Sequence, residues 1–232
     1  MRRRARVAVL VAALAIIGST GLTAADAAHE HGQLDVTALA IASEADRTSA
    51  EDAFDVARLN GPLVDSNVVG ASNSTCDGCS SRATALGVVY VKHGGRIVVD
   101  NLATAASSGC TECSSVAVSA QVVVLRRPEV IVANNRSLAV NAACISCTTS
   151  AVAYQFVVVA PKAGNLTGDD LVVLRAWVRA QADALTRGVG ASLRSSAGSA
   201  GSGGAAATVE KELRERLGPG ATVTTKVDVR QG

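Results

Sequence analysis

Runs of β-branched residues recur along the chain, and turn-forming residues separate them. Two of the clearest runs are Val122–Val124 and Val157–Val159. Such runs favour strands over helices, because β-branched side chains pack well on a pleated surface. Breaks fall at Lys92–Gly95 and Pro161–Asn165, where glycine or proline interrupts the apolar pattern. The pattern therefore predicts a mainly β protein made of short strands.

The strand-like segments belong to a repeat. Three CxxC motifs occur, and their first cysteines, Cys76, Cys110 and Cys144, are successively 34 residues apart. The flanking segments match as well, since Gln121 and Gln155 in the segments after the second and third motifs are also 34 residues apart. Equal spacing with matching flanks indicates an array of structural repeats.

A degenerate, acidic unit leads the array. Val36–Ala42 and Ala53–Ala57 resemble the two strand segments of a unit, but no cysteines lie between them. Asp77–Gly78 is a favoured pair for a tight turn, which places each CxxC at a bend between two strands. Looser bends are expected where Thr111–Glu112 and Ile145–Ser146 replace that pair. We expect stacked or meandering β-hairpin repeats of about 34 residues. A helix that spans each CxxC and the following valine run is the alternative.

The pattern becomes helical after the repeats. Residues 169–187 carry one apolar stripe, made by Leu171, Leu174, Trp177, Val178 and Leu185. Thr167 or Asp169 is suited to cap the start of this helix, and Arg187–Gly188 marks its end. Trp177, the single tryptophan of the chain, is expected to anchor the helix to the core.

The C-terminal part is expected to be loosely attached. Residues 188–207 are rich in glycine, alanine and serine and lack periodicity, which predicts a flexible linker. A short helix over Val209–Leu217 and a strand over Ala221–Val227 follow. This tail is too small to fold alone, so it is predicted to be mobile or to dock on another surface.

Residues 1–27 have the form of a secretory signal peptide. Arg2, Arg3, Arg4 and Arg6 precede the apolar run Val7–Ile17, and Ala25-Asp26-Ala27 fits the small-x-small rule for cleavage between Ala27 and Ala28. The run is short for a membrane span, which needs ~20 apolar residues. An uncleaved anchor is the alternative. No later segment is long and apolar enough to span a bilayer. The mature protein is therefore expected to be secreted.

These patterns divide the chain into six parts. They are the signal peptide 1–27, an acidic lead repeat 28–66, three CxxC repeats 67–165, a closing helix 166–187, a flexible linker 188–207 and a helix-strand tail 208–232. Removing the four arginines and Asp26 of residues 1–27 lowers the formal net charge from +2 to −1. A near-neutral mature chain argues against a nucleic-acid partner, which requires a concentrated basic face.

The repeat resembles a family. The pattern Asn-x-Ala…Cys-x-x-Cys…Ala-x-Ala-x-Gln-Val-Val, clearest over Asn141–Val159, resembles the extracellular CxxC-repeat region of actinobacterial proteins labelled peptide zinc metalloproteases. The resemblance covers about residues 34–187. Those larger relatives take their label from a separate segment with an HExxH motif, which this chain lacks. The resemblance therefore implies a secreted actinobacterial protein without peptidase activity.

The six cysteines are the main candidates for chemistry. In an exported protein, evenly spaced cysteines indicate disulfides first. The ends of a tight turn lie within ~7 Å, a distance that a disulfide can span. We therefore expect the bridges Cys76–Cys79, Cys110–Cys113 and Cys144–Cys147, while bridges between neighbouring repeats stay open as an option.

Two other uses of the same cysteines are weighed against disulfides. A thiol–disulfide enzyme places CxxC at a helix N-terminus, whereas these motifs lie in strand-like turns. A zinc site could use two CxxC pairs, but the gap between Cys79 and Cys110 exceeds the usual spacing of ~15–20 residues.

Other catalytic patterns are absent from the sequence. His29-Glu30-His31 places its histidines two apart rather than one helical turn apart, and His93 lies in a glycine-rich turn and is expected to be solvated. No GxSxG elbow or P-loop occurs. We therefore predict a secreted, non-catalytic repeat scaffold or binding module, with no catalytic residue, cofactor or metal. Its partner is unknown; another extracellular or cell-envelope protein is one option. An extracytoplasmic redox or metal-binding protein is the alternative.

Overall fold

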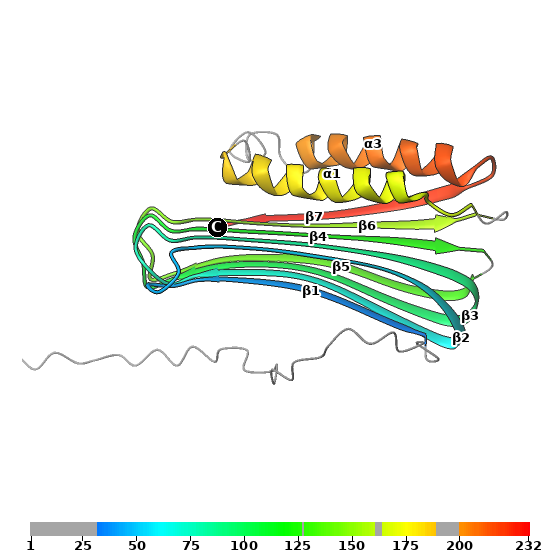
Figure 1. Ribbon diagram of the computed structural model, residues 1–232, viewed down its shortest axis with the longest axis horizontal. Coiled ribbons are helices and arrows are strands. Elements are labelled where there is room, and N and C mark those ends of the chain that lie inside the picture. The colour runs from blue at the N-terminus through cyan, green and yellow to red at the C-terminus, as the bar shows by residue number, and fades with distance from the viewer. Residues whose placement is uncertain (1–31, 127, 161–163, 189–199) are drawn as a thin grey trace, which may run out of the picture.

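The protein is described by a computed structural model, which covers residues 32–126, 128–160, 164–188 and 200–232. The predicted signal peptide and the cleavage site between Ala27 and Ala28 lie outside the described residues, as do His29 and His31. Figure 1 shows a stack of long strands with two helices on one side.

Six strands form the stack by parallel pairing. They are β1 (Gln33–Ala42), β2 (Thr48–Ser74), β3 (Ser80–Ser108), β4 (Ser114–Leu125), β5 (Pro128–Ala142) and β6 (Thr148–Val159). Each strand pairs with the strand about one repeat later, so that Ser80 aligns with Ser114 and Ser114 with Thr148. The chain is therefore a β-solenoid of about four coils.

The coils form two layers, because β2 and β3 bend half-way and run through both (Figure 1). One layer, called the covered layer, contains residues 48–59 of β2, residues 80–91 of β3, and β4 and β6. The other, called the open layer, contains β1, residues 63–74 of β2, residues 94–108 of β3, and β5. The CxxC motifs turn the chain from the open layer to the covered layer.

The predicted mainly β fold of stacked repeats is confirmed, and the bend at each CxxC is present. The strand segments directly next to a motif, however, do not pair with each other as in a hairpin. They lie in opposite layers, and each pairs in parallel with the equivalent segments of the neighbouring coils. A run of valines favours a strand but does not specify which strand it pairs with, so the pairing could not be predicted from the sequence.

The bends are also more alike than predicted. Gly78, Glu112 and Ser146 occupy equivalent turn positions, and all three have left-handed backbones, with φ of 65°, 55° and 57°. The Gly78 and Glu112 amides donate to carbonyls of the next coil at 2.8 Å. These bonds between coils hold Glu112 and its neighbours in the same tight turn that the glycine adopts, so the bend is not looser without glycine.

Apolar side chains fill the space between the layers. Val36, Val68, Val89, Val99 and Val123 are all at most 3% exposed and belong to one cluster. Near the CxxC end the cluster gives way to alanines such as Ala103 and Ala151, both fully buried. Small side chains there allow the two layers to approach as the chain turns.

Two buried glutamines cross the space between the layers. Gln155 Nε2 donates to Gln121 Oε1 at 2.8 Å and to the backbone oxygen of Asn134 at 3.0 Å. Gln121 Nε2 donates to the backbone oxygen of Ser66 at 3.1 Å. Neither glutamine is exposed. The pair therefore links adjacent coils of the covered layer to the open layer by hydrogen bonds of both amide nitrogens, while Gln155 Oε1 has no partner among the described residues.

Helix α1 (Gly168–Thr186) packs on the outer face of the covered layer, in good agreement with the prediction over residues 169–187. Thr167 accepts from Asp170 N, and the Asp170 carboxylate accepts from Thr167 N at 2.8 Å. This bond lowers the pKa of Asp170 below its ordinary value. Trp177 packs edge-on against Tyr154, with ring centroids 4.8 Å apart, which confirms its role as an anchor.

The tail is docked rather than loosely attached. Helix α3 begins at Ala200 and ends at Leu217, so residues 200–207 are helical where a flexible linker was predicted; residues 189–199 lie outside the described part. Ala206, Val209, Leu213 and Leu217 bury one stripe of α3 against the core. Neither α1 nor α3 is long and apolar enough to cross a bilayer.

Strand β7 (Thr222–Gln231) completes the covered layer by pairing antiparallel with β6. Its side chains also reach the edge of β5: Lys226 Nζ donates to the Ala133 carbonyl at 2.5 Å, and the Asp228 carboxylate accepts from Ser137 N at 2.8 Å. β7 thus closes the C-terminal edges of both layers. The tail was predicted to be mobile or to dock, and the structure shows docking. The sequence did not indicate which strand β7 would pair with.

Candidate functional site

The CxxC turns stack above one another at one end of the solenoid. Cys76, Cys79, Cys110 and Cys113 are at most 6% exposed, so their sulfurs face the interior. Stacking follows from the 34-residue period, because equivalent positions of parallel, in-register coils lie side by side. The sequence therefore determined the position of this group of cysteines.

Two of the three predicted bridges are present. Disulfides join Cys76 to Cys79 and Cys110 to Cys113, with Cα–Cα distances of 5.3 and 6.2 Å. Cys144 and Cys147 are half-buried and occur as free thiols. The third bridge stays a prediction.

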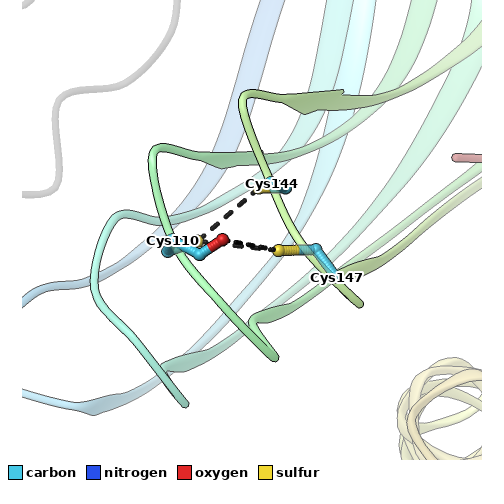
Figure 2. Close-up of side chains that lie close together, drawn as sticks. All are labelled: Cys110, Cys144 and Cys147. Atoms are coloured by element: carbon cyan, nitrogen blue, oxygen red, sulfur yellow. Dashed lines mark hydrogen bonds between the residues drawn. The ribbon is translucent and has the colours of Figure 1, made fainter.

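The free thiols lie against the preceding motif. Cys110 Sγ is 3.7 Å from Cys144 Sγ and 3.8 Å from Cys147 Sγ. Figure 2 shows the three side chains, with Cys144 and Cys147 on the turn next to that of Cys110. Burial, followed by the hydrogen bond with Cys144, raises the pKa of the Cys147 thiol. A neutral thiol is a poor nucleophile and a poor metal ligand, so the arrangement favours a resting structural role.

The three sulfurs also bear on the metal alternative. Cys110, Cys144 and Cys147 place their sulfurs within 4.8 Å of one another. Metals bind thiolates, and Cys110 is engaged in its bridge with Cys113, so only an opened bridge would offer this set to a metal. Among the described residues, Cys76 and Cys79 do not join the group.

Non-reducing peptide mapping tests the predicted connectivity. We expect three cross-linked peptides, one for each CxxC motif, because an oxidising compartment converts the adjacent Cys144 and Cys147 thiols into the third bridge. Replacing both Cys144 and Cys147 by serine should leave the first two bridges unchanged. A peptide that joins Cys110 to Cys144 or to Cys147, or zinc bound in stoichiometric amount, would contradict within-motif pairing.

His93 and the acidic side chains of the lead unit are two further groups of polar residues. His93 is exposed, as predicted. Asp52 lies 2.9 Å from the Arg179 guanidinium of α1, and Glu44 and Asp46 are exposed at the first turn. These carboxylates are spread over the N-terminal coil.

A second candidate region is the outer face of the open layer, which sequence reasoning did not single out. Large apolar side chains there are 40–56% exposed: Leu39, Ile41, Leu63, Val130, Leu138 and Val140. Alternation of apolar residues on both faces of β1 and β5 was the available signal, because a strand with one solvated face normally carries polar residues outward.

Comparisons with known proteins add no family assignment. No family model, no curated protein and no solved structure matches this chain.

Proposed function

We propose that the protein is a secreted, non-catalytic repeat scaffold, stabilised by disulfides, that binds a protein partner through the outer face of the open layer. The single observation that supports this most is the contrast between the two layers. The described helices pack on the covered layer, while the open layer carries six large apolar side chains outward. Monomeric proteins rarely expose contiguous apolar areas above a few hundred Å².

The pattern of this face matches a second copy of the same chain. The parallel register aligns Leu39, on β1, with Leu138, on β5, and Ile41 with Val140. The two edge strands therefore carry large residues at equal heights, with small residues such as Ala71 and Thr104 between them. A two-fold axis along the strands, between β2 and β3, would place β5 of one copy over β1 of the other.

Charges on the same face agree with that axis. Arg136 of one copy would lie over Thr37 of the other, beside the Asp35 carboxylate, and the axis makes this contact twice. Arg96 would lie beside Asp65, whose Oδ1 has no hydrogen-bond partner among the described residues. Four strands of about ten residues offer roughly 600 Å² per copy, which approaches the lower end of stable interfaces.

The test measures association of the mature protein by sedimentation over a range of concentrations. We expect a dimer, and we expect Leu39→Lys combined with Leu138→Lys to raise its dissociation constant at least 100-fold. Val172→Lys with Val173→Lys is the matched control, because these valines are 64% and 51% exposed on α1. Arg136→Asp should weaken the dimer, and adding Asp35→Arg should restore it.

The outcomes separate the scaffold from its partner. A chain that stays monomeric at all concentrations overturns self-association. The scaffold proposal then stands only if two conditions are met in the secreting culture. Cross-linking must join one defined protein to the open layer. The two lysine substitutions on that layer must abolish this cross-link, while the control substitutions on α1 must not. Cross-links on neither layer would overturn both.

The cysteine geometry favours one second candidate, a site for a thiophilic metal. Zinc–sulfur bonds of ~2.3 Å in a tetrahedron give sulfur–sulfur distances of about 3.8 Å, close to the 3.7 and 3.8 Å found around Cys110. This candidate requires the Cys110–Cys113 bridge to be open. Measuring the zinc content of the protein beside the peptide mapping tests it, because stoichiometric zinc is expected only if the bridge is open.

A further inference from the structure

Three basic residues of successive coils lie at the same end of the covered layer. Arg58, Lys92 and Arg126 are 34 residues apart in the sequence, like the CxxC motifs. Lys92 and Arg126 directly follow the aligned residues Val91 and Leu125, whereas Arg58 aligns with Tyr90, two residues before Lys92. Neighbouring strands are ~4.8 Å apart, so Lys92 and Arg126 are like charges in adjacent coils that repel each other, and Arg58 adds a third positive charge at the same end.

The three basic residues line a cavity of about 240 Å³. Asn60 and Asn165 add amide groups to its wall, and Tyr90 adds a phenol ring. Among the described residues that line the cavity, there is no carboxylate. Its polar groups are therefore mainly hydrogen-bond donors with a net positive charge.

The positive charges are not neutralised within the described part of the chain. None of the described ion pairs involves Arg58, Lys92 or Arg126. The Arg58 guanidinium lies over the Tyr90 ring, 5.5 Å from its centroid. Arg126 Nε is buried and has no hydrogen-bond partner in the described part of the chain. A buried charged donor without an acceptor is costly, which indicates that an acceptor is missing from the site.

The hydroxyl of Tyr90, which lines the cavity, has no acceptor among the described residues. Its oxygen accepts from Leu166 N at 3.0 Å, which leaves the phenol proton for another acceptor. Burial raises the pKa of this phenol, so it stays protonated at neutral pH. Tyr90 is thus a fourth donor beside the three cations.

We propose that this cavity binds a small polyol that carries a doubly charged oxyanion, such as a sugar phosphate. Three cations around one space favour a dianion, and guanidinium groups match phosphate oxygens in geometry. The volume equals that of about eight water molecules, which exceeds the need of a bare phosphate. The Asn60 and Asn165 amides are suited to form hydrogen bonds with hydroxyl groups in the uncharged part of such a ligand. This site is distinct from the open-layer face and goes beyond the proposed scaffold.

Calorimetric titration of the mature protein at constant ionic strength tests the proposal, with glucose 6-phosphate, inorganic phosphate and glucose as probes. We expect glucose 6-phosphate to bind more tightly than phosphate, and glucose not to bind. Arg126→Gln and Lys92→Gln should each weaken binding at least tenfold. Lys211→Gln, at a 79% exposed position of α3 outside the cavity, is the matched control and should bind like the unmodified protein.

Thermal unfolding without ligand separates binding from structure. Because Arg126→Gln removes a repelled and unpaired charge, its Tm should equal or exceed that of the unmodified protein. A lower Tm for both glutamine variants would show that the cations are structural and would overturn the proposal. Three other results would overturn it as well. They are no binding of any probe, equal affinity in all variants, and equal affinity for inorganic phosphate and glucose 6-phosphate.

Discussion

A chain that ends at Gly220, and so lacks β7, is expected to lose solubility and to form large assemblies at micromolar concentration. β7 pairs with β6 over Thr222–Gln231, and without it the whole edge of β6 presents unpaired backbone groups. Phe156 and Tyr154 of β6 are almost fully buried and would lose part of their cover. An exposed, long and apolar edge is a template for aggregation. Size-exclusion chromatography with light scattering measures the effect.

A peptide supplied in trans provides the control for this truncation. Residues 221–232 added as a synthetic peptide should pair with the free edge of β6 and restore the size distribution of the full chain. A scrambled peptide of equal composition should not. If the truncated chain has the same size and the same Tm as the full chain, β7 is not the element that protects this edge.

Gln155→Leu is expected to destabilise the fold by roughly 2–3 kcal/mol, because it leaves a buried acceptor without its donor. Gln155 Nε2 is the donor for Gln121 Oε1, and it also bonds the Val99 carbonyl at 3.2 Å. Both glutamines are fully buried, so water cannot replace the lost bonds. Urea unfolding followed by circular dichroism measures the free energy of unfolding.

The double variant Gln121→Leu with Gln155→Leu sharpens the measurement. Removing both partners leaves no orphaned amide between them, so its cost should be less than the sum of the two single costs. Gln33→Leu is the matched control on an exposed position of β1 and should change stability by less than ~0.5 kcal/mol. Strict additivity would show that the two side chains do not act as a pair.

Much of the fold follows from features that are periodic along the sequence. The 34-residue spacing of Cys76, Cys110 and Cys144 predicts stacking, and the stripe with Trp177 predicts the helix on the stack. The partner of each strand was not predictable from the same residues. Whether a valine run pairs within its unit or with the next is decided by the packing of both layers, which is a property of the whole array.

The candidate sites show the same division. The cysteines were found because CxxC is a recognised motif, although the proximity of Cys144 to Cys110 needed the structure. Arg58, Lys92 and Arg126 had an equally regular signal, their 34-residue spacing in the sequence, but isolated basic residues in polar turns are ordinary. Only the cavity and the unpartnered Arg126 Nε make them a site.

The pair of helices on the covered layer limits how many coils this architecture can hold. Two packed helices span about 20 Å, the width of about four strands, and α1 and α3 lie over β3, β4, β6 and β7. The outward positions of β4 are accordingly apolar, as in Val118 and Val122, whereas the lead coil places Asp52 and Arg58 outward at the margin. Duplication of an inner 34-residue unit would widen the covered layer beyond the width that α1 and α3 cover. A longer descendant of this chain would therefore need either a further helix or a coil whose outward valines had become polar. The number of coils and the helices that cover them must therefore evolve together.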